Sequence, residues 1–442
     1  MASESYDVLV IGAGAAGLAA AAELSAARRS VLVLEARDRI GGRIWTHHEP
    51  GLPVPVELGA EFIHGEPRST LELMRRFGVA AVDSDGPHWT LQRGRLRLRA
   101  DEFRQVHAAL RKGRPRLRAR DLTFAEFLAR IAPARLTRAA RGLALALVEG
   151  FDAADPALVS ARSIVEEWVE GDALDAPQSR PLGGYGALLA PLARSLERPN
   201  VRLQLNAAVR SLQWRKGAAV AEGVQLGEAF RVEARAVIAT LPLGVLKLPP
   251  GAPGAVRFDP PLPDKEAALR QLASGPVLKA VLRFREPFWE SANGGACRDA
   301  AFFHAPEAPF PTFWTALPVR VPLLVAWSGG PRAARLAGGG RDAAVKAALA
   351  SVRAVFGARL AGGAALESAA LHDWQRDPYA RGAYGYVLAN GGGARRALAR
   401  PIEGTLFFAG EAADVEGEGG TVAGALNSGS AVARALLRAQ GS

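Results

Sequence analysis

The segment Val8–Glu35 reads VLVIGAGAAGLAAAAELSAARRSVLVLE. An apolar run typical of a strand leads directly into three glycines, Gly12, Gly14 and Gly17, with the spacing G-x-G-x-x-G. An alanine-rich stretch typical of a helix follows, and a second apolar run ends at the acidic Glu35. This order of strand, glycine turn, helix, strand and acid predicts a βαβ unit that binds a dinucleotide.

Each residue of this pattern has a physical task in such a unit. Gly12 permits the tight turn after the strand, Gly14 lets a pyrophosphate approach the backbone, and Gly17 lets the helix pack closely on the strand. The helix N-terminus offers N–H groups and the positive end of its dipole to the phosphates. Glu35 is expected to accept a hydrogen bond from a ribose hydroxyl.

A second glycine pair follows the acid, in the segment 36–46, which reads ARDRIGGRIWT. Gly41-Gly42 allows another close approach of the backbone, and Arg43 can offer its guanidinium fork to a pyrophosphate. Near the C-terminus, 406–411 reads LFFAGE and 419–425 reads GGTVAGA, which is expected to open a final helix. These features favour a larger, permanently held dinucleotide over a nicotinamide cofactor, with a second helix N-terminus directed at it.

With these motifs the chain resembles the flavin-containing amine oxidases, which include monoamine oxidases, polyamine oxidases, flavin-type histone lysine demethylases and L-amino-acid oxidases. The resemblance spans nearly the whole chain. Its further motifs are ELGAEFIHG at 57–65, LGGYG at 182–186, VIATLP at 237–242, Lys279 before Phe284 and the PFW of 287–289, DW at 373–374 before DP at 377–378, and GE at 410–411. Within the family, FIHG at 62–65 and RGAY at 381–384 are most similar to the polyamine oxidases and demethylases.

The resemblance implies an α/β fold in which a Rossmann-like FAD-binding domain of the GR2 type is interleaved with an α+β substrate-binding domain. The FAD-binding domain is expected to comprise residues 1–82, 186–264 and 386–442. The substrate-binding domain is expected to comprise residues 83–185 and 265–385.

Hydrophobic periodicity and turn residues predict the elements between these motifs. Thr123 and Glu126 have the spacing of a capping box at a helix start. Strands are expected at 93–99, 201–205, 207–214 and 236–240, helices at 101–112, 123–131, 141–149 and 163–170, and loops at 249–263 and 291–296.

Lys279 is the first candidate for a catalytic residue, because it interrupts the apolar strand sequence VLKAVLRF at 277–284. A lysine is costly to bury, so it either faces solvent at a strand edge or has a specific partner. The resemblance implies that it lies beside the flavin and reaches flavin N5 through a water molecule.

The resemblance also implies an aromatic site for the amine. It places Trp374 near the flavin and Tyr384 in front of the flavin ring, where an electron-rich face can orient an amine; both could instead be core aromatics. Thr421 aligns with a second tyrosine of monoamine oxidases and with a threonine of demethylases, so the cage is expected to be half open. Ala383 replaces the cysteine that bonds to the flavin in monoamine oxidases, which predicts noncovalent FAD.

His64 and Glu61 lie in the segment expected to pass beside the flavin. His64 is interpreted as a residue that either hydrogen-bonds the substrate nitrogen or titrates near neutral pH, or else as a structural histidine. L-amino-acid oxidases have a carboxylate-binding arginine where this chain has Glu61-Phe62, so an α-amino acid substrate is disfavoured, and Arg68 could replace that arginine only with another geometry.

The acids of the segment 414–418 are a further candidate feature. They either line the substrate entrance and attract additional ammonium groups, or form an exposed loop. They are Asp414, Glu416 and Glu418.

The residues expected to contact the cofactor come from the motifs above, together with one strand residue, and no metal ion is expected. They are Gly12, Gly14, Ala15, Ala16, Gly17, Glu35, Ala36, Arg37, Gly41, Gly42, Arg43, Gly59, Ala60, Glu61, Phe62, Val209, Trp374, Gly410, Glu411, Gly420, Thr421 and Val422. The predicted catalytic set is Lys279, Tyr384, Trp374, His64 and Thr421.

Composition is typical of a soluble enzyme with a sizeable core. The single cysteine, Cys297, suits a reducing compartment, and the early first strand and the absence of a long apolar stretch favour a cytoplasmic protein without a membrane anchor. The formal net charge of +11 is concentrated in the segment 93–141. That segment is interpreted as a solvated face rather than a nucleic-acid surface, because its densest part lacks aromatic residues that could stack on bases.

The sequence therefore predicts an FAD-dependent amine oxidase. As the resemblance implies, hydride passes from the amine α-carbon to flavin N5, the imine hydrolyses, and O2 reoxidises the flavin to give H2O2. The substrate is expected to be a primary or secondary amine or a polyamine. Two alternatives stay open: an FAD-dependent desaturase or porphyrinogen-type oxidase of the same fold, and a non-catalytic flavoprotein whose basic face binds an acidic partner or nucleic acid.

Overall fold

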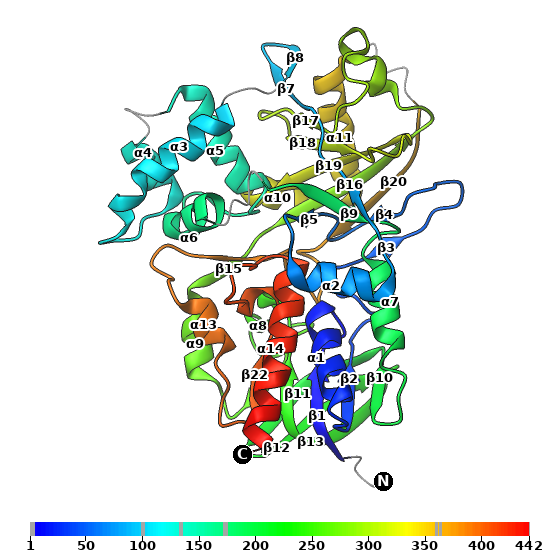
Figure 1. Cartoon of the computed structure of the whole chain (residues 1–442), viewed down its shortest axis with the longest axis vertical. Coiled ribbons are helices and arrows are strands. Elements are labelled where there is room, and N and C mark those ends of the chain that lie inside the picture. Colours follow the sequence, from blue (N-terminus) through cyan, green and yellow to red (C-terminus); the bar gives the residue numbers. More distant parts are fainter. Residues whose placement is uncertain are drawn as a thin grey trace.

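Two β-sheets and a block of helices organise the chain in the computed structural model (Figure 1). The structure describes residues 5–98, 102–131, 136–170, 176–358, 361 and 365–441. Both sheets are built from segments that lie far apart in the sequence. The α/β fold with a Rossmann-like part, predicted from the sequence, is confirmed, whereas the domain boundaries stay predictions.

The first sheet contains the parallel strands of the predicted βαβ unit. Parallel pairing joins β1 to β2 and β13, while β11, β12 and β13 form an antiparallel meander. The strands lie in the order β10 (Val201–Gln204), β2 (Val31–Leu34), β1 (Ser5–Ile11), β13 (Glu228–Ala239), β12 (Ala218–Gln225), β11 (Ala207–Arg215) and β14 (Arg257–Asp259), and β22 (Leu406–Phe408) pairs in parallel with β13.

Alternation along β1 explains why this sheet is buried on both faces. Val8 and Val10 join a core with α1 (Ala15–Ala26) and α14 (Val422–Gly441), whereas Leu9 and Ile11 join the core on the opposite face. Helices α1 and α14 lie side by side along the sheet (Figure 1). The N-terminal ends of both helices therefore face the same region between the two sheets.

The second sheet is antiparallel except where β17 pairs in parallel with β7. Helices α10 (Gly330–Ala337) and α11 (Gly340–Phe356) cover one face. The strand order is β20 (Leu366–Asp373), β16 (Val277–Phe284), β19 (Leu323–Gly329), β18 (Thr312–Thr315), β17 (Phe302–His304), β7 (His88–Gln92) and β8 (Arg95–Leu98).

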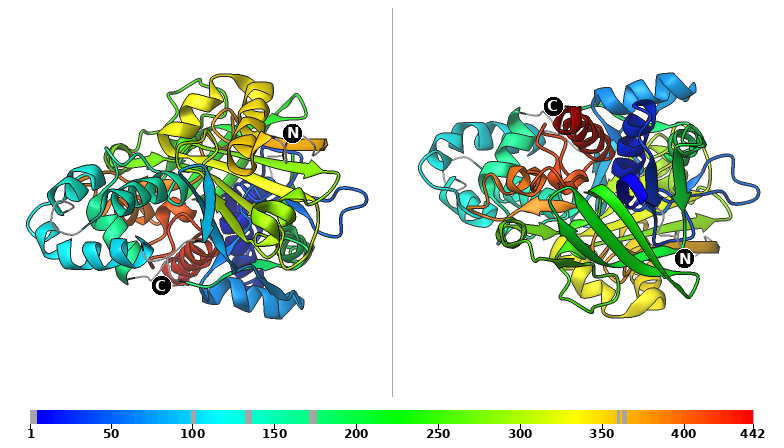
Figure 2. Two further views of the ribbon diagram at one scale, coloured as in Figure 1. Left: turned by 90° about the horizontal axis from the view of Figure 1, so that it is seen from above. Right: turned by 90° about the horizontal axis from the view of Figure 1, so that it is seen from below.

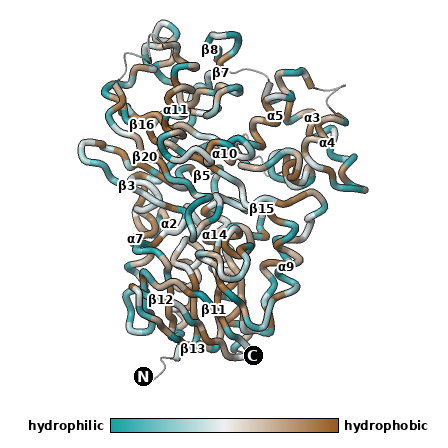
Figure 3. The backbone as a smooth tube through the Cα atoms, turned by 180° about the vertical axis from the view of Figure 1, so that it is seen from behind, coloured by the Kyte–Doolittle hydropathy of each residue, from teal (hydrophilic) through white to brown (hydrophobic). Residues whose placement is uncertain are grey.

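The helical block projects to one side of the molecule (Figure 2). It has a core of its own, centred on Phe124, Phe127 and Trp168. Figure 3 shows apolar segments in the interior of both sheets and more polar segments along outer turns. The block comprises α3 (Glu102–Gly113), α4 (Phe124–Ile131), α5 (Arg138–Gly150), α6 (Ala161–Val165) and a π-helical turn, Glu166–Glu170.

Several predicted element boundaries change. The capping box is confirmed, because Thr123 N donates to Glu126 and Glu126 N donates to the Thr123 hydroxyl, both at 3.2 Å. The predicted loop 249–263 was wrong in part, since it contains β14 and the first residue of α9 (Pro263–Arg270). Likewise, 291–296 overlaps a 3-10 helix, Phe288–Gly295.

The predicted strand at 93–99 and the predicted helix at 141–149 also shift. The strand is β8 and starts at Arg95, because Arg93 and Gly94 form a turn with positive φ. The helix begins earlier, at Arg138, where the Thr137 hydroxyl caps it. Arg99 and Asp101, the ends of two predicted elements, lie outside the described residues.

No helix in the described ranges combines the length and the apolar character needed to cross a bilayer.

Candidate active site

A cavity of about 1180 Å³ is lined by residues of both sheets and of the helical block. Every predicted site residue except Gly17 lines this cavity. The structure therefore brings together side chains from the N-terminal βαβ unit, the second sheet and the C-terminal segment. Their individual roles stay predictions, and the geometry below gives the basis for them.

The glycines at one end of the cavity meet different physical requirements. A Cβ on Gly17 would lie 1.9 Å from the Gly12 carbonyl oxygen, and a Cβ on Gly12, whose φ is +106°, would lie 2.6 Å from the Thr240 hydroxyl. A Cβ on Gly14 meets nothing closer than Gly41 O at 3.9 Å. Gly12 and Gly17 are thus required by packing, while Gly14 leaves open space in the cavity wall.

Glu35 lies at the same end and is 4% exposed. Its Oε2 accepts a hydrogen bond from Ala13 N at 2.8 Å, and its Oε1 accepts one from Arg37 N at 2.9 Å. These bonds fix the carboxylate against the glycine turn. Because each carboxylate oxygen has two lone pairs, Glu35 can still accept a ribose hydroxyl as predicted.

Arg43 connects the second glycine pair to the C-terminal segment. Its Nη1 forms an ion pair with Glu411 at 2.8 Å and also donates to the Ala383 carbonyl. Burial raises the pKa of Glu411, but the charges of Arg43 and Arg395 lower it below its ordinary value. Arg43 is therefore engaged by the protein itself, and its predicted contact with a pyrophosphate stays a prediction.

Helix α14 begins at the cavity because Thr421 caps it. The Thr421 hydroxyl accepts from Gly424 N at 3.0 Å and donates to Glu418 O at 2.8 Å. Thr421 and Val422 line the cavity, as do Ala15 and Ala16 at the start of α1. Two helix N-termini thus present their positive dipole ends to one space, which suits an anionic group.

Lys279 is buried at 1% exposure and has a specific partner, the second of the two arrangements that its sequence allows. On β16 it shares the face of Val281, opposite the face covered by α11. Its Nζ donates to Glu61 Oε2 at 2.7 Å and to Gly59 O at 3.1 Å.

Glu61 is itself held by two further donors. Its Oε1 accepts from Arg180 Nε at 2.8 Å and from Trp314 Nε1 at 3.0 Å. Burial raises the pKa of Glu61, but the charges of Lys279 and Arg180 and the hydrogen bonds lower it below its ordinary value. Lys279 and Glu61 therefore form a buried ion pair in the cavity wall.

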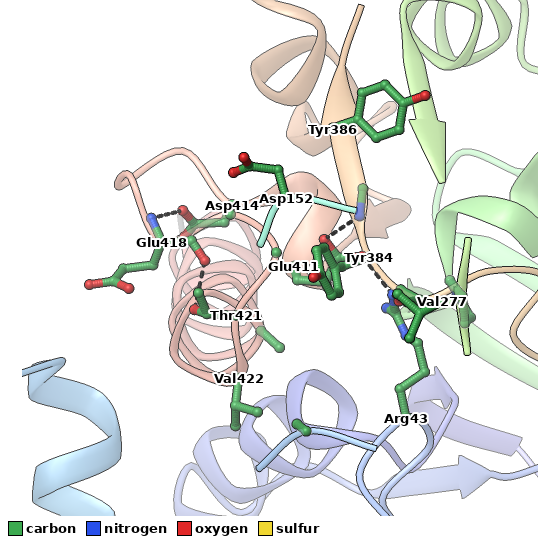
Figure 4. A pocket seen from close by; sticks show the side chains of 18 of the residues that line it. Arg43, Asp152, Val277, Tyr384, Tyr386, Glu411, Asp414, Glu418, Thr421 and Val422 are labelled. Carbon is green, nitrogen blue, oxygen red and sulfur yellow. Dashed lines mark hydrogen bonds and ion pairs between the residues drawn. The ribbon is translucent and has the colours of Figure 1, made fainter. Parts of the chain in front are cut away.

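Two aromatic side chains also line the cavity. Trp374 Nε1 donates to Leu58 O at 3.0 Å, which places the indole against the segment that carries Gly59. The Tyr384 hydroxyl donates to Phe151 O at 2.6 Å, and a Cβ on Gly420 would touch the Tyr384 ring at 3.6 Å. Tyr384 and Thr421 therefore flank the same part of the cavity (Figure 4), and the half-open cage stays a prediction.

The surroundings of His64 favour a neutral imidazole over one that titrates near neutrality. Its ring lies between Phe62 and Phe151, at centroid distances of 6.1 and 5.2 Å. Burial lowers the pKa of His64 to about 4, so the imidazole is neutral at pH 7. It still lines the cavity and can form hydrogen bonds.

The other predicted charged residues separate into two groups. Asp414 is 2% exposed and accepts backbone hydrogen bonds from Glu416 N and Glu418 N, so it orders the loop from within, and the exposed-loop interpretation is wrong for this residue. Asp414, Glu416 and Glu418 all line the cavity. Arg68 pairs with Glu72 on the surface, its side chain 89% exposed, which is no position for a carboxylate-binding residue.

The sequence interpretation missed two acids of the helical block, Asp152 and Glu167, which line the same cavity. It also missed Trp327, whose Nε1 donates to Gly150 O at 2.6 Å. Asp152 follows a helix in the unremarkable sequence GFDAADP, and Glu167 lies in the predicted helix 163–170. Neither has a spacing pattern that would have marked it.

The family model for flavin-containing amine oxidoreductases matches residues 15–437. The chain belongs to this family. The lysine-specific histone demethylase 1 homolog 3 of Arabidopsis thaliana is 27% identical over 96% of this chain and 29% of its own length. Polyamine oxidase 2 of the same plant is 28% identical over 65% of this chain and 61% of its own length.

A solved structure, wild-type putrescine oxidase bound to putrescine, matches 98% of this chain and 99% of its own chain with a TM-score of 0.81. At 22% identity, this likeness shows the shared fold. The chain spans less than two thirds of the length of the curated relatives described above. The comparisons show membership of the family, and the activity and substrate of this chain are matters for proposal.

Proposed function

We propose that this protein binds FAD noncovalently and uses O2 to oxidise a primary or secondary amine. The observation that carries the proposal is that one cavity joins a glycine turn and two helix N-termini to a buried lysine and an aromatic wall. The glycine turn and the helix N-termini suit a dinucleotide. The buried lysine and the aromatic wall suit the oxidation of an amine next to it.

The residues at the glycine end fit FAD. Gly14 leaves room for a pyrophosphate, the N-termini of α1 and α14 favour its charge, and Glu35 can bind a ribose. Cys297 is fully buried in the core of the second sheet and is not among the cavity residues, which supports noncovalent binding. The alanine at position 383, where monoamine oxidases have a cysteine, supports it too.

Held by Gly14, Glu35 and the two helix N-termini, FAD would supply a two-electron oxidant that O2 regenerates with formation of H2O2, and water would hydrolyse the resulting imine to a carbonyl compound and an amine or ammonia. The residues of the chain prepare the amine for this step. An alkylammonium loses a proton at a cost of about 4–5 kcal/mol at pH 7. An enclosed site walled by the Tyr384 ring disfavours the charged form and so lowers this cost.

Three measurements test the proposal. The purified protein should be yellow, and acid precipitation should release its flavin into the supernatant; flavin that stays on the polypeptide would contradict noncovalent binding. Anaerobic addition of a suitable amine should bleach the flavin absorbance, and admission of O2 should restore it with one H2O2 per turnover. Failure of every amine in a panel of monoamines, diamines and amino acids to bleach the flavin would reject amine oxidation.

A further inference from the structure

The helical block, which projects from the two sheets, carries a dense group of cations that the proposed reaction does not use (Figure 2). Seven cationic side chains lie between residues 111 and 130, and all seven are exposed. None of them lines the cavity. We call this group the cationic patch. It consists of Arg111, Lys112, Arg114, Arg116, Arg118, Arg120 and Arg130.

Packing gathers these cations from two helices and the segment between them. Helix α3 ends against α4, because a Cβ on Gly113 would lie 2.8 Å from the Phe127 ring and 3.0 Å from the Ile131 side chain. Arg116 Nη1 donates to Arg130 O at 2.9 Å, which holds the segment after α3 against the last turn of α4. Cations that are distant in the sequence therefore share one surface.

The acids of the same stretch do not neutralise the patch. They are Asp121 and Glu126. Asp121 is 7% exposed and is directed into the fold, where it accepts from the Ser160 hydroxyl at 2.7 Å. Glu126 accepts from Thr123 N as part of the capping box. Both carboxylates therefore serve local hydrogen bonds.

Arginines elsewhere on the surface do have acidic partners. Arg231 pairs with Glu222 at 2.6 Å and Arg434 with Glu23 at 2.8 Å, although both arginine side chains are 52% exposed. Apart from Arg114, no cation of the patch forms an ion pair with a residue that the structure describes. The patch thus differs from the rest of the surface in pairing as well as in charge.

Helix dipoles account for only part of the patch. Three of its cations lie in the last turns of α3 and α4, where a positive charge is stabilising. Arg118 and Arg120 instead follow the 3-10 helix Arg114–Leu117 and belong to neither α-helix. Their charges have no acidic counterpart among the described residues, so an anion on another molecule would supply one.

The side chains of the patch select among polyanions. Among the described residues 104–131, no large apolar or aromatic side chain is exposed. The patch therefore lacks the apolar residues that insert a basic surface into a membrane or form the centre of a protein interface. It also lacks aromatic residues on which unpaired bases could stack. A nucleic-acid duplex needs neither, because arginine forks bind its phosphates directly.

We propose that the cationic patch binds the phosphate backbone of a nucleic-acid duplex, in place of the solvated face expected from the sequence. The contact is independent of base sequence, because phosphates carry no sequence information. Cations accumulate around a duplex as counterions, so docking holds the cavity where cationic amines are concentrated. The binding itself does not depend on the proposed oxidation, since the patch lies outside the cavity.

The first test measures how salt weakens the binding. Holoenzyme is titrated into a short DNA duplex that carries a red dye, whose emission lies away from that of flavin, and fluorescence anisotropy is followed. If about six cations contact phosphates, each doubling of the salt concentration should weaken the affinity by about 40-fold. An affinity that does not change with salt would overturn the proposal.

The second test removes two charges from the patch. Arg118→Gln combined with Arg120→Gln should weaken binding at low salt by about tenfold or more, and each doubling of salt should then cost only about tenfold. The matched control, Arg194→Gln with Arg198→Gln, makes the same change in net charge at two exposed residues. They lie at the end of α7 (Gly186–Arg194), across the molecule from the helical block (Figure 1). An equal loss of affinity in both double variants would overturn the patch.

Competition with other polyanions tests the choice of partner. An unlabelled single strand of the same length, and vesicles of phosphatidylserine and phosphatidylcholine, should each displace the labelled duplex less effectively than unlabelled duplex does. Better displacement by either one would overturn the assignment to a duplex. A protein whose flavin is bleached by amines but which does not bind the duplex would reject the patch alone. Duplex binding by a protein whose flavin no amine bleaches would reject amine oxidation alone.

Discussion

Backbone atoms shape one end of the cavity, and side chains shape the other. At the glycine end, the shape of the wall comes from backbone within one short segment, Gly12–Gly42, and from helix N-termini. At the amine end it comes from side chains brought together over long separations: Lys279 and Glu61 are 218 residues apart, and Tyr384 and Phe151 are 233 apart. The glycine end should therefore be sensitive to added volume, and the amine end to uncompensated charge.

The largest effect is expected at Gly17. Gly17→Ala places a Cβ 1.9 Å from a backbone oxygen, a clash that no side-chain rotation can relieve. We expect the free energy of unfolding of the apoprotein to fall by about 3 kcal/mol or more, measured by denaturant titration. Unchanged stability would show that α1 and β1 are not packed as closely as the structure has them.

Gly14→Ala is the matched comparison within the same turn. Its Cβ would project into open space, so the apoprotein should keep its stability to within about 0.5 kcal/mol. The affinity for FAD should nevertheless fall by about tenfold, because the added methyl group occupies space that a pyrophosphate would approach. Equal FAD affinity in Gly14→Ala and the unmodified protein would place the cofactor elsewhere in the cavity.

At the amine end, Lys279→Met should lower the free energy of unfolding by about 3 kcal/mol. The substitution leaves the buried Glu61 carboxylate without its ammonium partner, although Arg180 and Trp314 still donate to it. Adding Glu61→Gln should recover part of the loss, giving a coupling of about 1–3 kcal/mol in a double-mutant cycle. Additive effects in denaturant titrations would mean that the two side chains do not form an ion pair.

Unfolding at low pH should distinguish Glu61→Gln from the unmodified protein. The pKa of Glu61 is lower in the folded protein than its ordinary value, so its stabilising contribution is complete above that value, about 4.3, and is lost as the pH falls below it. Glu61→Gln cannot titrate, so its stability should fall less steeply below about pH 4 than that of the unmodified protein. Parallel acid-unfolding curves for the two proteins would contradict the lowered pKa.

The same contrast explains what the sequence could predict. The glycine turn was predictable because its geometry depends on residues only a few positions apart, and β1, α1 and β2 occur as expected. For Lys279, the apolar strand around it predicted a buried lysine with a partner as one of two arrangements. The identity of that partner, Glu61, depends on how two distant segments pack.

The acidic residues show more clearly what the sequence could not predict. Asp414 was grouped with Glu416 and Glu418 by spacing alone, yet it is buried while Glu416 is exposed. Asp152 and Glu167 carry no local pattern, because they meet only when the turn after α5 packs against the π-helical turn. Hydrophobic periodicity indicates which face of its own helix or strand a residue occupies. It does not indicate which other element packs against that face.

Tyr384→Phe tests the aromatic wall with a smaller change. It removes the hydrogen bond to Phe151 O and keeps the ring, so stability should fall by about 1 kcal/mol. The ring position is also less fixed, so kcat/KM for a good amine should fall severalfold while FAD remains bound. Loss of FAD from this variant would show that Tyr384 supports the cofactor rather than the amine.

The smallest effect is expected at His64. Because burial lowers its pKa to about 4, the imidazole is neutral throughout the range from about pH 6 to 8, where an ordinary histidine titrates. Since the folded protein binds this proton less readily than the unfolded chain, His64 reduces stability only as the pH falls from about 6.5 towards 4. His64→Asn should therefore leave the shape of the kcat/KM profile between about pH 6 and 8 unchanged and make unfolding less sensitive to acid below it. A kinetic pKa near neutrality that disappears in His64→Asn would show that the side chain titrates in the working enzyme, and that water reaches this end of the cavity more freely than its burial indicates.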